Sequence, residues 1–345
     1  MSAANDGAAP AAPAVGMNAA PEWTTGERTR LRAAFQAGRL PHALLIHEAP
    51  GAGGEWLATW AAQLVLCREP ARAPCGACAG CRRVWALQHP DLTWLRATGD
   101  SRQIRIEQVR ELAAELALTA HGGGYKVAIV SPADALNRFA ANALLKTLEE
   151  PPPRTLLVLV ATQPSRLPPT VLSRCQRLRV RAPTRIEGVA WLTAQRGTGE
   201  WGEALDVVGE APMLLVQAEP REIAQVGLDV RRTLDALTEG SADPVAAAER
   251  WARGEALALR LKGFENWLTD QIRRRAPSAA SFTELRGGPY LPAGGVVLNI
   301  RELFGLLDEV RELRATLDVP LNRGLALEAL FRRLARQGAP SEDRM

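Results

Sequence analysis

The sequence predicts an α/β domain with a P-loop-type, mostly parallel sheet, followed by a small helical domain and a larger all-helical domain. Two observations carry this prediction. Short apolar runs alternate with helix-length segments up to about residue 181, which is the pattern of strand–helix–strand units with helices on both faces of a sheet. Beyond that residue, helical spacing of apolar side chains dominates, and Gly-rich turns separate the segments.

The strands and helices of the α/β domain follow one another in a regular order. "YKVAIV" and "TLLVLVAT" are short apolar runs with β-branched residues, which suit buried strands of a parallel sheet. The helix before the prolines "PPP" has an apolar face that includes Phe139 and Leu148. The expected segments are helix 22–40, strand 43–46, helix 56–67, strand 91–97, helix 104–118, strand 125–130, helix 134–150, strand 155–162, helix 165–175 and strand 176–180.

Composition and charge narrow the class of protein, and changes of pattern along the chain suggest its domain limits. The Ala/Pro-rich start lacks the apolar core of a signal peptide, and no run of about 18 apolar residues indicates a membrane-spanning helix. We therefore expect a cytoplasmic protein without a membrane partner. The net charge of +4 permits contact with nucleic acid without demonstrating it. The expected parts are a disordered tail (1–21), the α/β domain (22–182), a small helical domain (183–224), a larger helical domain (225–338) with a loop at 276–295, and a second tail (339–345).

The stretch "HEAPGAGGEW" occupies the position of a phosphate-binding loop, between an apolar strand and a helix. A working loop has a lysine that balances phosphate charge and a hydroxyl that holds Mg²⁺. This chain has Gly54 and Glu55 at those two places, although Gly51 and Gly53 still permit the turn. Glu48 stands where the motif has its first glycine. The changes remove a positive charge and add a negative one, so they disfavour a bound nucleotide.

A second ATP-handling element is missing after the strand "KVAIV". An ATPase of this fold has acidic residues there that hold Mg²⁺ and orient water, but this chain continues with Ser131, Pro132 and Ala133. Asp134 comes next and is expected to cap the following helix. With two elements lost, we expect no ATP hydrolysis by this chain, whereas nucleotide binding without hydrolysis is less strongly excluded.

Four of the five cysteines are clustered, at Cys67, Cys75, Cys78 and Cys81. Four thiolates on short loops can close a tetrahedron around one zinc ion, and a site with four protein ligands is structural and not catalytic. Free thiols, an iron–sulfur cluster and disulfides are the alternatives. Disulfides need an oxidising compartment, and nothing in the chain suggests export or redox work. The prediction is one structural Zn²⁺ per chain.

The stretch "ANALLKTLEEPPPRTLLVLVATQPSRLPPTVLSRCQRL" resembles the clamp-loader branch of the AAA+ ATPases. "PHALLIHEAPGAGG" and the four-cysteine insertion fit the same branch, most closely over residues 30–182, and "PLNRGLALEALFRRLAR" resembles its final helix. The degenerate loop, the cysteines and the Ser-Arg-Cys motif together are similar to the non-hydrolysing subunit of the bacterial DNA polymerase III clamp loader. The resemblance implies an AAA+ domain, a lid and a C-terminal collar.

The resemblance also implies partners and a role for one arginine. The partners would be the ATPase and clamp-opening subunits of a hetero-pentamer, the sliding clamp, and primed DNA through the complex, at the nucleoid-associated replisome of a bacterium. In this family the arginine of the Ser-Arg-Cys motif, here Arg174, reaches a neighbour's ATP site as an arginine finger. Ser173 is expected to order the loop and Cys175 to pack.

Two other functional classes stay open at the level of sequence. One is an active AAA+ ATPase with an unusual phosphate loop, which the pair Gly54 and Glu55 argues against. The other is a zinc-dependent DNA-binding module, which predicts tight DNA binding by the isolated chain. On the helix before "PPP", the residues Lys146, Glu149 and Glu150 form either a solvated face or a surface for a neighbouring subunit or DNA.

Overall fold

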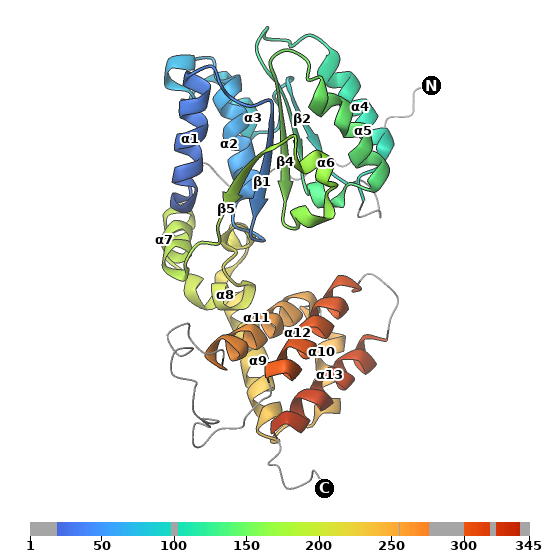
Figure 1. Ribbon diagram of the computed structural model, residues 1–345. Helices are drawn as coiled ribbons and strands as arrows, with labels where there is room; N and C mark the ends of the chain where they lie inside the picture. The colour runs from blue at the N-terminus through green and yellow to red at the C-terminus, as the bar shows by residue number, and fades with distance from the viewer. Residues whose placement is uncertain (1–18, 98–102, 255, 276–299, 318–321, 339–345) are drawn as a thin grey trace, which may run out of the picture. The chain divides into compact units, whose positions relative to one another are not determined.

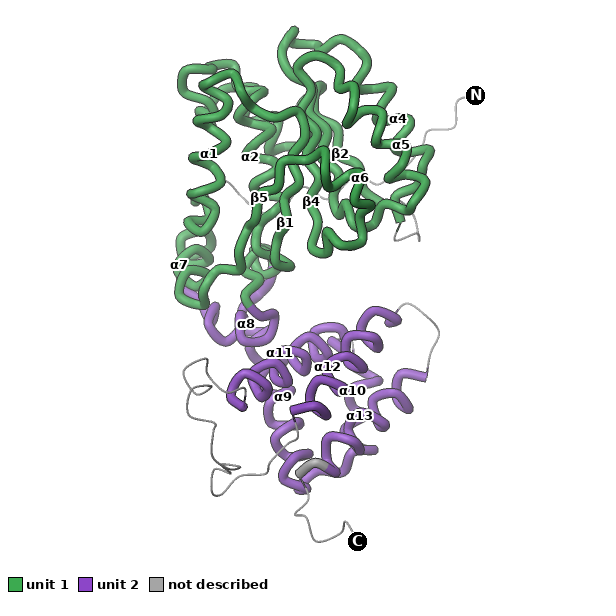
Figure 2. Tube along the Cα trace, in the orientation of Figure 1, with its two compact units in different colours: residues 1–197, 210–217 green, residues 198–209, 218–345 purple. Residues whose placement is uncertain are grey.

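The computed structural model describes residues 19–97, 103–254, 256–275, 300–317 and 322–338. These residues form two compact units, one of residues 1–197 and 210–217 and the other of residues 198–209 and 218–345, each including its undescribed stretches (Figure 2). The loop expected at 276–295 lies outside the described residues, as do the tail at 339–345 and most of the tail at 1–21. No helix of the described chain is long and apolar enough to cross a membrane.

The first unit is built on a five-stranded parallel sheet with the strand order β2-β3-β4-β1-β5. Figure 1 shows α1, α2 and α3 on one side of the sheet and α4 and α5 on the other. The strands are β1 (Ala43–Glu48), β2 (Leu92–Leu95), β3 (Lys126–Val130), β4 (Thr155–Ala161) and β5 (Gln176–Val180). The helices are α1 (Thr25–Gln36), α2 (Gly54–Leu66), α3 (Ala79–Trp85), α4 (Ile106–Ala117), α5 (Arg138–Glu149), α6 (Pro169–Leu172) and α7 (Arg185–Arg196), with short 3-10 turns η1 (Glu22–Thr24), η2 (Pro70–Arg72), η3 (Ala133–Ala135), η4 (Pro164–Arg166) and η5 (Pro212–Leu215).

The sheet is apolar because both of its faces are covered. Every residue of β4 is buried, and four of the five residues of β3 are buried, as expected for the centre of a parallel sheet. Glu48 is the last residue of β1, two residues beyond the expected end of that strand, and it is also buried. The strand register places Glu48 beside Val180 of β5, at the edge of the sheet from which the loop to α2 leaves. The predicted fold class is confirmed for this unit.

The second unit contains only helices among its described residues. They are α8 (Trp201–Val208), α9 (Pro220–Thr238), α10 (Pro244–Arg253), α11 (Leu257–Arg275), α12 (Ile300–Ala315) and α13 (Arg323–Gly338). Trp251, Phe264 and Phe331 meet in its core with ring centroids 5.0 to 6.3 Å apart. A buried carboxylate, Glu265, accepts from Arg314 Nε at 2.6 Å and lies 3.5 Å from Lys262 Nζ, so an ion pair links α11 to α12.

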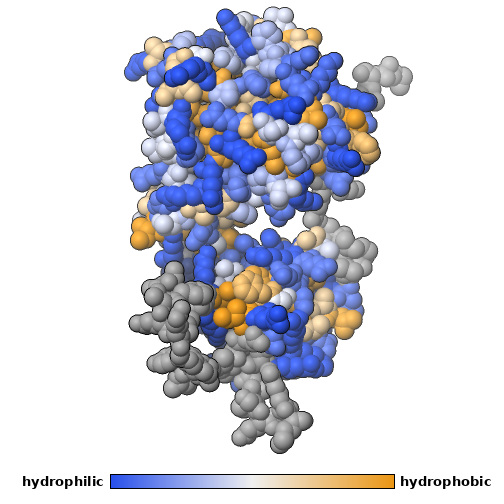
Figure 3. Space-filling view, viewed as in Figure 1, coloured by the Kyte–Doolittle hydropathy of each residue, from blue (hydrophilic) through white to orange (hydrophobic). Residues whose placement is uncertain are grey.

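On the face drawn in Figure 3, apolar groups form scattered patches among charged side chains. One apolar residue differs from expectation, because Phe139 is 69% exposed whereas Leu148 of the same helix is buried.

Candidate functional site

The loop from β1 to α2 has the path of a phosphate loop. Gly51 and Gly53 have φ angles of 70° and 106°, a left-handed region that favours glycine. The turn aims the backbone N–H groups of Gly53 and Gly54 into one place at the start of α2, which is where a phosphate would be bound.

A side chain of the protein itself fills that place. Glu48 Oε2 accepts from Gly53 N at 3.0 Å and from Gly54 N at 2.6 Å. The Glu48 residue is only 9% exposed. The backbone donors that would cradle a phosphate are therefore satisfied internally by a carboxyl group. The sequence located Glu48 at the first glycine of the motif but did not predict this contact.

The surroundings of Glu48 change its protonation. Burial is the main cause that raises its pKa from 4.5 to about 7, and repulsion from Glu55 and Asp134 adds to the rise. The hydrogen bonds from Gly54 and Gly53 act in the opposite direction, because they stabilise the charged carboxylate. Both protonation states are thus populated near neutral pH. One oxygen, Oε2, takes both backbone bonds, so Oε1 is available for the proton.

Residue 54 has no room for a side chain. A Cβ atom at Gly54 would lie 2.7 Å from Glu48 Cδ and 2.9 Å from Val160 Cγ1, which are distances that non-bonded carbon atoms do not tolerate. The missing lysine is therefore linked to the presence of Glu48, since a lysine at this position would collide with the carboxyl group.

Glu55 stands where the motif has its hydroxyl. Its Oε2 accepts from Arg96 Nη2 at 2.9 Å, and its Oε1 accepts from Ser131 Oγ at 2.7 Å. The guanidinium of Arg96 also lies 4.6 Å from the centre of the Trp94 ring. The negative charge that the sequence predicted here is real, but a protein cation compensates it.

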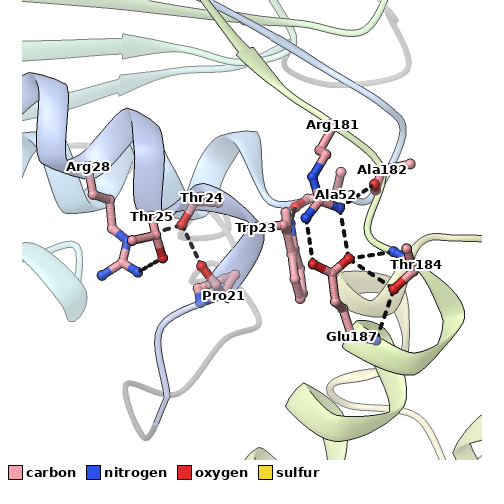
Figure 4. A network of polar contacts seen from close by, with 10 residues as sticks. All are labelled: Pro21, Trp23, Thr24, Thr25, Arg28, Ala52, Arg181, Ala182, Thr184 and Glu187. Atoms are coloured by element: carbon pink, nitrogen blue, oxygen red, sulfur yellow. Dashed lines mark hydrogen bonds and ion pairs between the residues drawn. The ribbon is translucent and has the colours of Figure 1, made fainter.

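The outer side of the loop is covered by other segments of the same unit. Trp23 Nε1 donates to Ala52 O at 2.7 Å, as Figure 4 shows. Met213 N donates to Gly51 O at 3.2 Å, and Met213 Cε lies 2.6 Å from the position of a Cβ atom at Gly53. The turn η5 therefore packs directly on the phosphate loop, a contact that the sequence did not indicate.

The segment after β3 differs from the expectation in one respect. Asp134 does not cap the next helix, because that helix begins at Arg138 and Asn137 Oδ1 accepts from Ala140 N at 2.8 Å. Instead, Asp134 Oδ2 accepts from Thr162 Oγ1 at 3.0 Å and from Gln163 N at 2.9 Å. Asp134 thus joins the ends of β3 and β4, and the expected cap was wrong.

The four clustered cysteines come together at the end of α2 and the start of α3. Their Sγ atoms all lie within 4.8 Å of one another. The Cys67–Cys78 and Cys75–Cys81 sulfur distances are 3.9 and 4.0 Å, close to the separation of about 3.8 Å that a tetrahedron with Zn–S bonds near 2.3 Å requires. The group can therefore hold a metal ion, and the thiolate set fits zinc.

Backbone geometry brings these sulfurs together. Cys78 N donates to Cys75 Sγ at 3.3 Å, and Cys81 N donates to Cys78 Sγ at 3.4 Å. A Cβ atom at Gly80 would lie 2.4 Å from Leu66 O, so a glycine is needed where α3 crosses the end of α2. Amide groups that point at sulfur stabilise thiolates, which are the form that binds metal.

The Ser-Arg-Cys motif follows the short helix α6. Cys175 is buried in the core, and burial raises its pKa to about 11, so its thiol is unreactive at neutral pH. Ser173 Oγ donates to Thr170 O at 3.1 Å. Arg174 is on the surface, and its Nη2 lies 2.7 Å from Glu149 Oε1. The parallel register pairs Gln176 with Leu44 near the start of β1, so Arg174 lies at the opposite end of the sheet from the phosphate loop, which follows the end of β1.

The end of β5 is fixed to α7 by a second polar group. Arg181 donates to both carboxylate oxygens of Glu187, at 2.8 and 2.5 Å, and Thr184 N also donates to Glu187 (Figure 4). The hydrogen bonds from Arg181 are the main cause that lowers the pKa of Glu187 to about 2. This contact sets the direction in which the chain leaves the sheet.

Comparisons with known proteins identify the family of this chain. The family described as "DNA polymerase III, delta subunit" matches residues 25–184. DNA polymerase III subunit delta' of Pseudomonas aeruginosa is 38% identical over 242 residues, which cover 67% of this chain and 72% of that protein. The subunit of the same name from Escherichia coli K12 is 38% identical over 174 residues, covering 50% of this chain and 52% of that protein.

A more distant relative has a different name. DNA polymerase III subunit tau of Escherichia coli K12 is 34% identical over 155 residues, which cover 45% of this chain and 24% of that protein. The identity is higher and the coverage is wider for the delta' proteins. The chain belongs to the delta' family of DNA polymerase III subunits.

Proposed function

We propose that this chain is a non-hydrolysing subunit of a clamp loader in DNA replication, and that it acts on a neighbouring subunit's ATP instead of binding its own. The position of the Glu48 carboxyl group is the main support for the proposal that this chain does not bind its own ATP. This group accepts from the two backbone N–H groups that a phosphate would need. A nucleotide would have to displace this buried group and push Met213 from the loop.

The charges around the loop also argue against hydrolysis. Glu55 and Arg96 form an ion pair at 2.9 Å, where an active site would hold Mg²⁺ between a hydroxyl and acidic residues. Ser131 donates to the same Glu55. These side chains satisfy one another, so among the described residues the loop has neither an open site for Mg²⁺ nor an unpaired cation for the γ-phosphate.

Arg174 is the group that we assign to a neighbour's ATP. Its side chain is exposed on a short segment in which Val171 and Cys175 are buried, so these two residues anchor the segment that carries the arginine. A guanidinium can stabilise the charge on a transferring phosphoryl group, and a finger supplied in trans contributes roughly 10³ to 10⁵ in rate. Ser173 supports the turn.

The remaining assignments follow from the family. We propose that the chain assembles with ATPase and clamp-opening subunits, and through that complex with the sliding clamp and primed DNA, in the bacterial cytoplasm. The domains would be an AAA+ domain (22–182) with a zinc module (67–81), a lid (183–224) and a collar (225–338). The cysteine cluster would hold one zinc ion that fixes α2 against α3.

Two measurements test the proposal. Calorimetric titration of the isolated chain with ATP and Mg²⁺ should show no binding, whereas the ATPase subunits serve as the positive control. In a reconstituted complex, Arg174→Ala should lower clamp- and DNA-stimulated ATP hydrolysis by about 10³ without loss of assembly, which size-exclusion chromatography checks. Hydrolysis by the isolated chain, or an unchanged rate in the Arg174→Ala complex, would contradict the proposal.

A further inference from the structure

Arg174 is held by a partner before any nucleotide arrives. Glu149 is the last residue of α5, and its Oε1 lies 2.7 Å from Arg174 Nη2. The other terminal nitrogen, Nη1, donates to Thr170 O at 3.0 Å and to Ser173 Oγ at 3.4 Å. Two sides of the guanidinium are thus tied to two different elements of the same unit, α5 and the end of α6.

Both elements are themselves fixed. Leu148, next to Glu149, is 2% exposed, and its carbonyl oxygen lies 3.0 Å from Nε2 of His42, the residue before β1. On the other side, Ser173 N donates to Pro169 O at 2.9 Å and Arg174 N donates to Val171 O at 3.1 Å. The carboxylate and the arginine backbone therefore have a defined separation, which a flexible loop would not give.

The contacts leave part of the guanidinium free to bind something else. A guanidinium has five N–H donors, and the three contacts engage at most three of them. Among the described residues, Nε makes no hydrogen bond. Because the group is planar, fixing Nη1 and Nη2 also fixes the direction of the remaining donors.

We propose that Glu149 is a positioning residue for Arg174, which sets the orientation in which the guanidinium meets the neighbour's phosphate. This inference rests on the proposed function of Arg174 as a finger in trans. Beyond that function, it names Glu149 as the residue on which the orientation of the Arg174 guanidinium depends.

An opposing effect has to be weighed, because a carboxylate beside the finger also repels phosphate. Water screens this repulsion, because the Glu149 side chain is half exposed and a phosphate bound to Arg174 would lie beyond the guanidinium, farther from the carboxylate. Orientation is the larger effect, since a finger is worth roughly 10³ to 10⁵ in rate only when its donors point at the phosphate. Removal of Glu149 should therefore slow the reaction.

The test compares three variants in the reconstituted complex. Glu149→Ala should lower kcat for ATP about two- to fivefold, the factor that corresponds to an exposed ion pair of up to about 1 kcal/mol. KM for ATP should stay the same, because the neighbour's own loop binds the nucleotide. Glu149→Gln keeps an oxygen that accepts from Arg174 and should retain most of the rate. Glu111→Ala is the control, since Glu111 is exposed on α4 of the same unit and has no contact with Arg174 among the described residues, and it should behave as wild type.

A double-mutant cycle separates this inference from the proposal beneath it. Glu149→Ala should have no further effect in the Arg174→Ala background, because the residue acts through the arginine. If Arg174→Ala slows hydrolysis but Glu149→Ala does not, the positioning role is wrong and the finger stands. A Glu149→Ala effect that persists without Arg174, or a Glu149→Gln loss equal to that of Glu149→Ala, also overturns the positioning role. An unchanged rate in Arg174→Ala contradicts the finger itself.

Discussion

Glu48 and Gly54 occupy one space: the Glu48 carboxyl group accepts from Gly54 N at 2.6 Å and lies where a side chain at residue 54 would begin. The two residues therefore depend on each other. Restoring a lysine at residue 54 alone would not recreate a phosphate site, because the carboxyl group would remain in its way.

The first prediction concerns this shared space. Gly54→Ala should lower the free energy of unfolding by roughly 1–3 kcal/mol, the usual cost of overpacking, although alanine is the better helix former. In the Glu48→Ala background the cost should be smaller, with a remainder due to Val160 Cγ1, 2.9 Å from the added atom. Denaturant unfolding gives the free energy of unfolding of Gly54→Ala, of Glu48→Ala and of the double variant. Gly26→Ala is the control, because Gly26 lies in α1 with no atom within 4 Å of its Cβ position; equal costs at both glycines would contradict the prediction.

The second prediction is a pH dependence. The pKa of Glu48 is raised to about 7 in the folded chain, so the folded state binds the proton more tightly than the unfolded state. The stabilisation that comes from proton binding by Glu48 is then fully present below pH 4.5 and is lost as the pH rises through 7. Relative to Glu48→Gln, wild type should lose roughly 3 kcal/mol over this range, at about 1.4 kcal/mol per pKa unit. Unfolding measured from pH 5 to 8 checks this, and a constant difference between the two proteins would be the contrary result.

The third prediction concerns the cysteine cluster. Elemental analysis should find about one zinc ion per chain in wild type and little in Cys78→Ser. Tm should fall in that variant and also when a strong chelator is added to wild type. Cys175→Ala is the comparison, because Cys175 is buried in the sheet core away from the cluster, and this variant should keep its zinc. Zinc retained in full by Cys78→Ser would count against the four-thiolate site.

The fourth prediction concerns the ion pair in the helical unit. Arg314→Ala leaves Glu265, which is 4% exposed, with only the more distant Lys262, so the free energy of unfolding should fall by about 3 kcal/mol, the low end for a buried ion pair that loses one partner. Arg311→Ala is the matched control on the same helix, where the partner Asp308 is 3.8 Å away and exposed, and its effect should stay below about 1 kcal/mol. Calorimetry measures both. Similar effects of the two variants would mean that the buried carboxylate does not depend on Arg314.

Much of the α/β unit could be predicted from local pattern. The apolar runs at β3 and β4 predicted strands, and the three prolines predicted the end of α5. The structure has both strands, and α5 ends at Glu149. The cysteine spacing predicted a cluster that the sulfur positions form. The predicted start of α5 was wrong, because a proline-led 3-10 turn precedes it and Asn137 supplies the cap.

The interactions that close the phosphate loop could not be predicted in the same way. Glu48 looked like a simple loss of glycine, and its role depends on burial beneath α2 that only the folded chain creates. Met213 is far away in sequence and reaches Gly53 through the fold. Arg96, the partner of Glu55, also comes from a distant element. The same holds outside the loop for Glu149, the partner of Arg174. The sequence signal for these contacts is an acidic residue at the end of a strand or a helix. That signal is weak, because many acidic residues at such positions in proteins have no ion-pair or hydrogen-bond partner.

The placement of η5 has a consequence for how the protein can be dissected. Because residues 198–209 belong to the second unit and residues 210–217 return to the first, the polypeptide passes from one unit to the other three times. No single peptide bond separates the two units, so a fragment that stops at residue 197 lacks Met213 and leaves Gly53 without its covering side chain. Limited proteolysis at one site should therefore yield pieces that remain associated, and recombinant halves are best designed with the returning segment attached to the first unit.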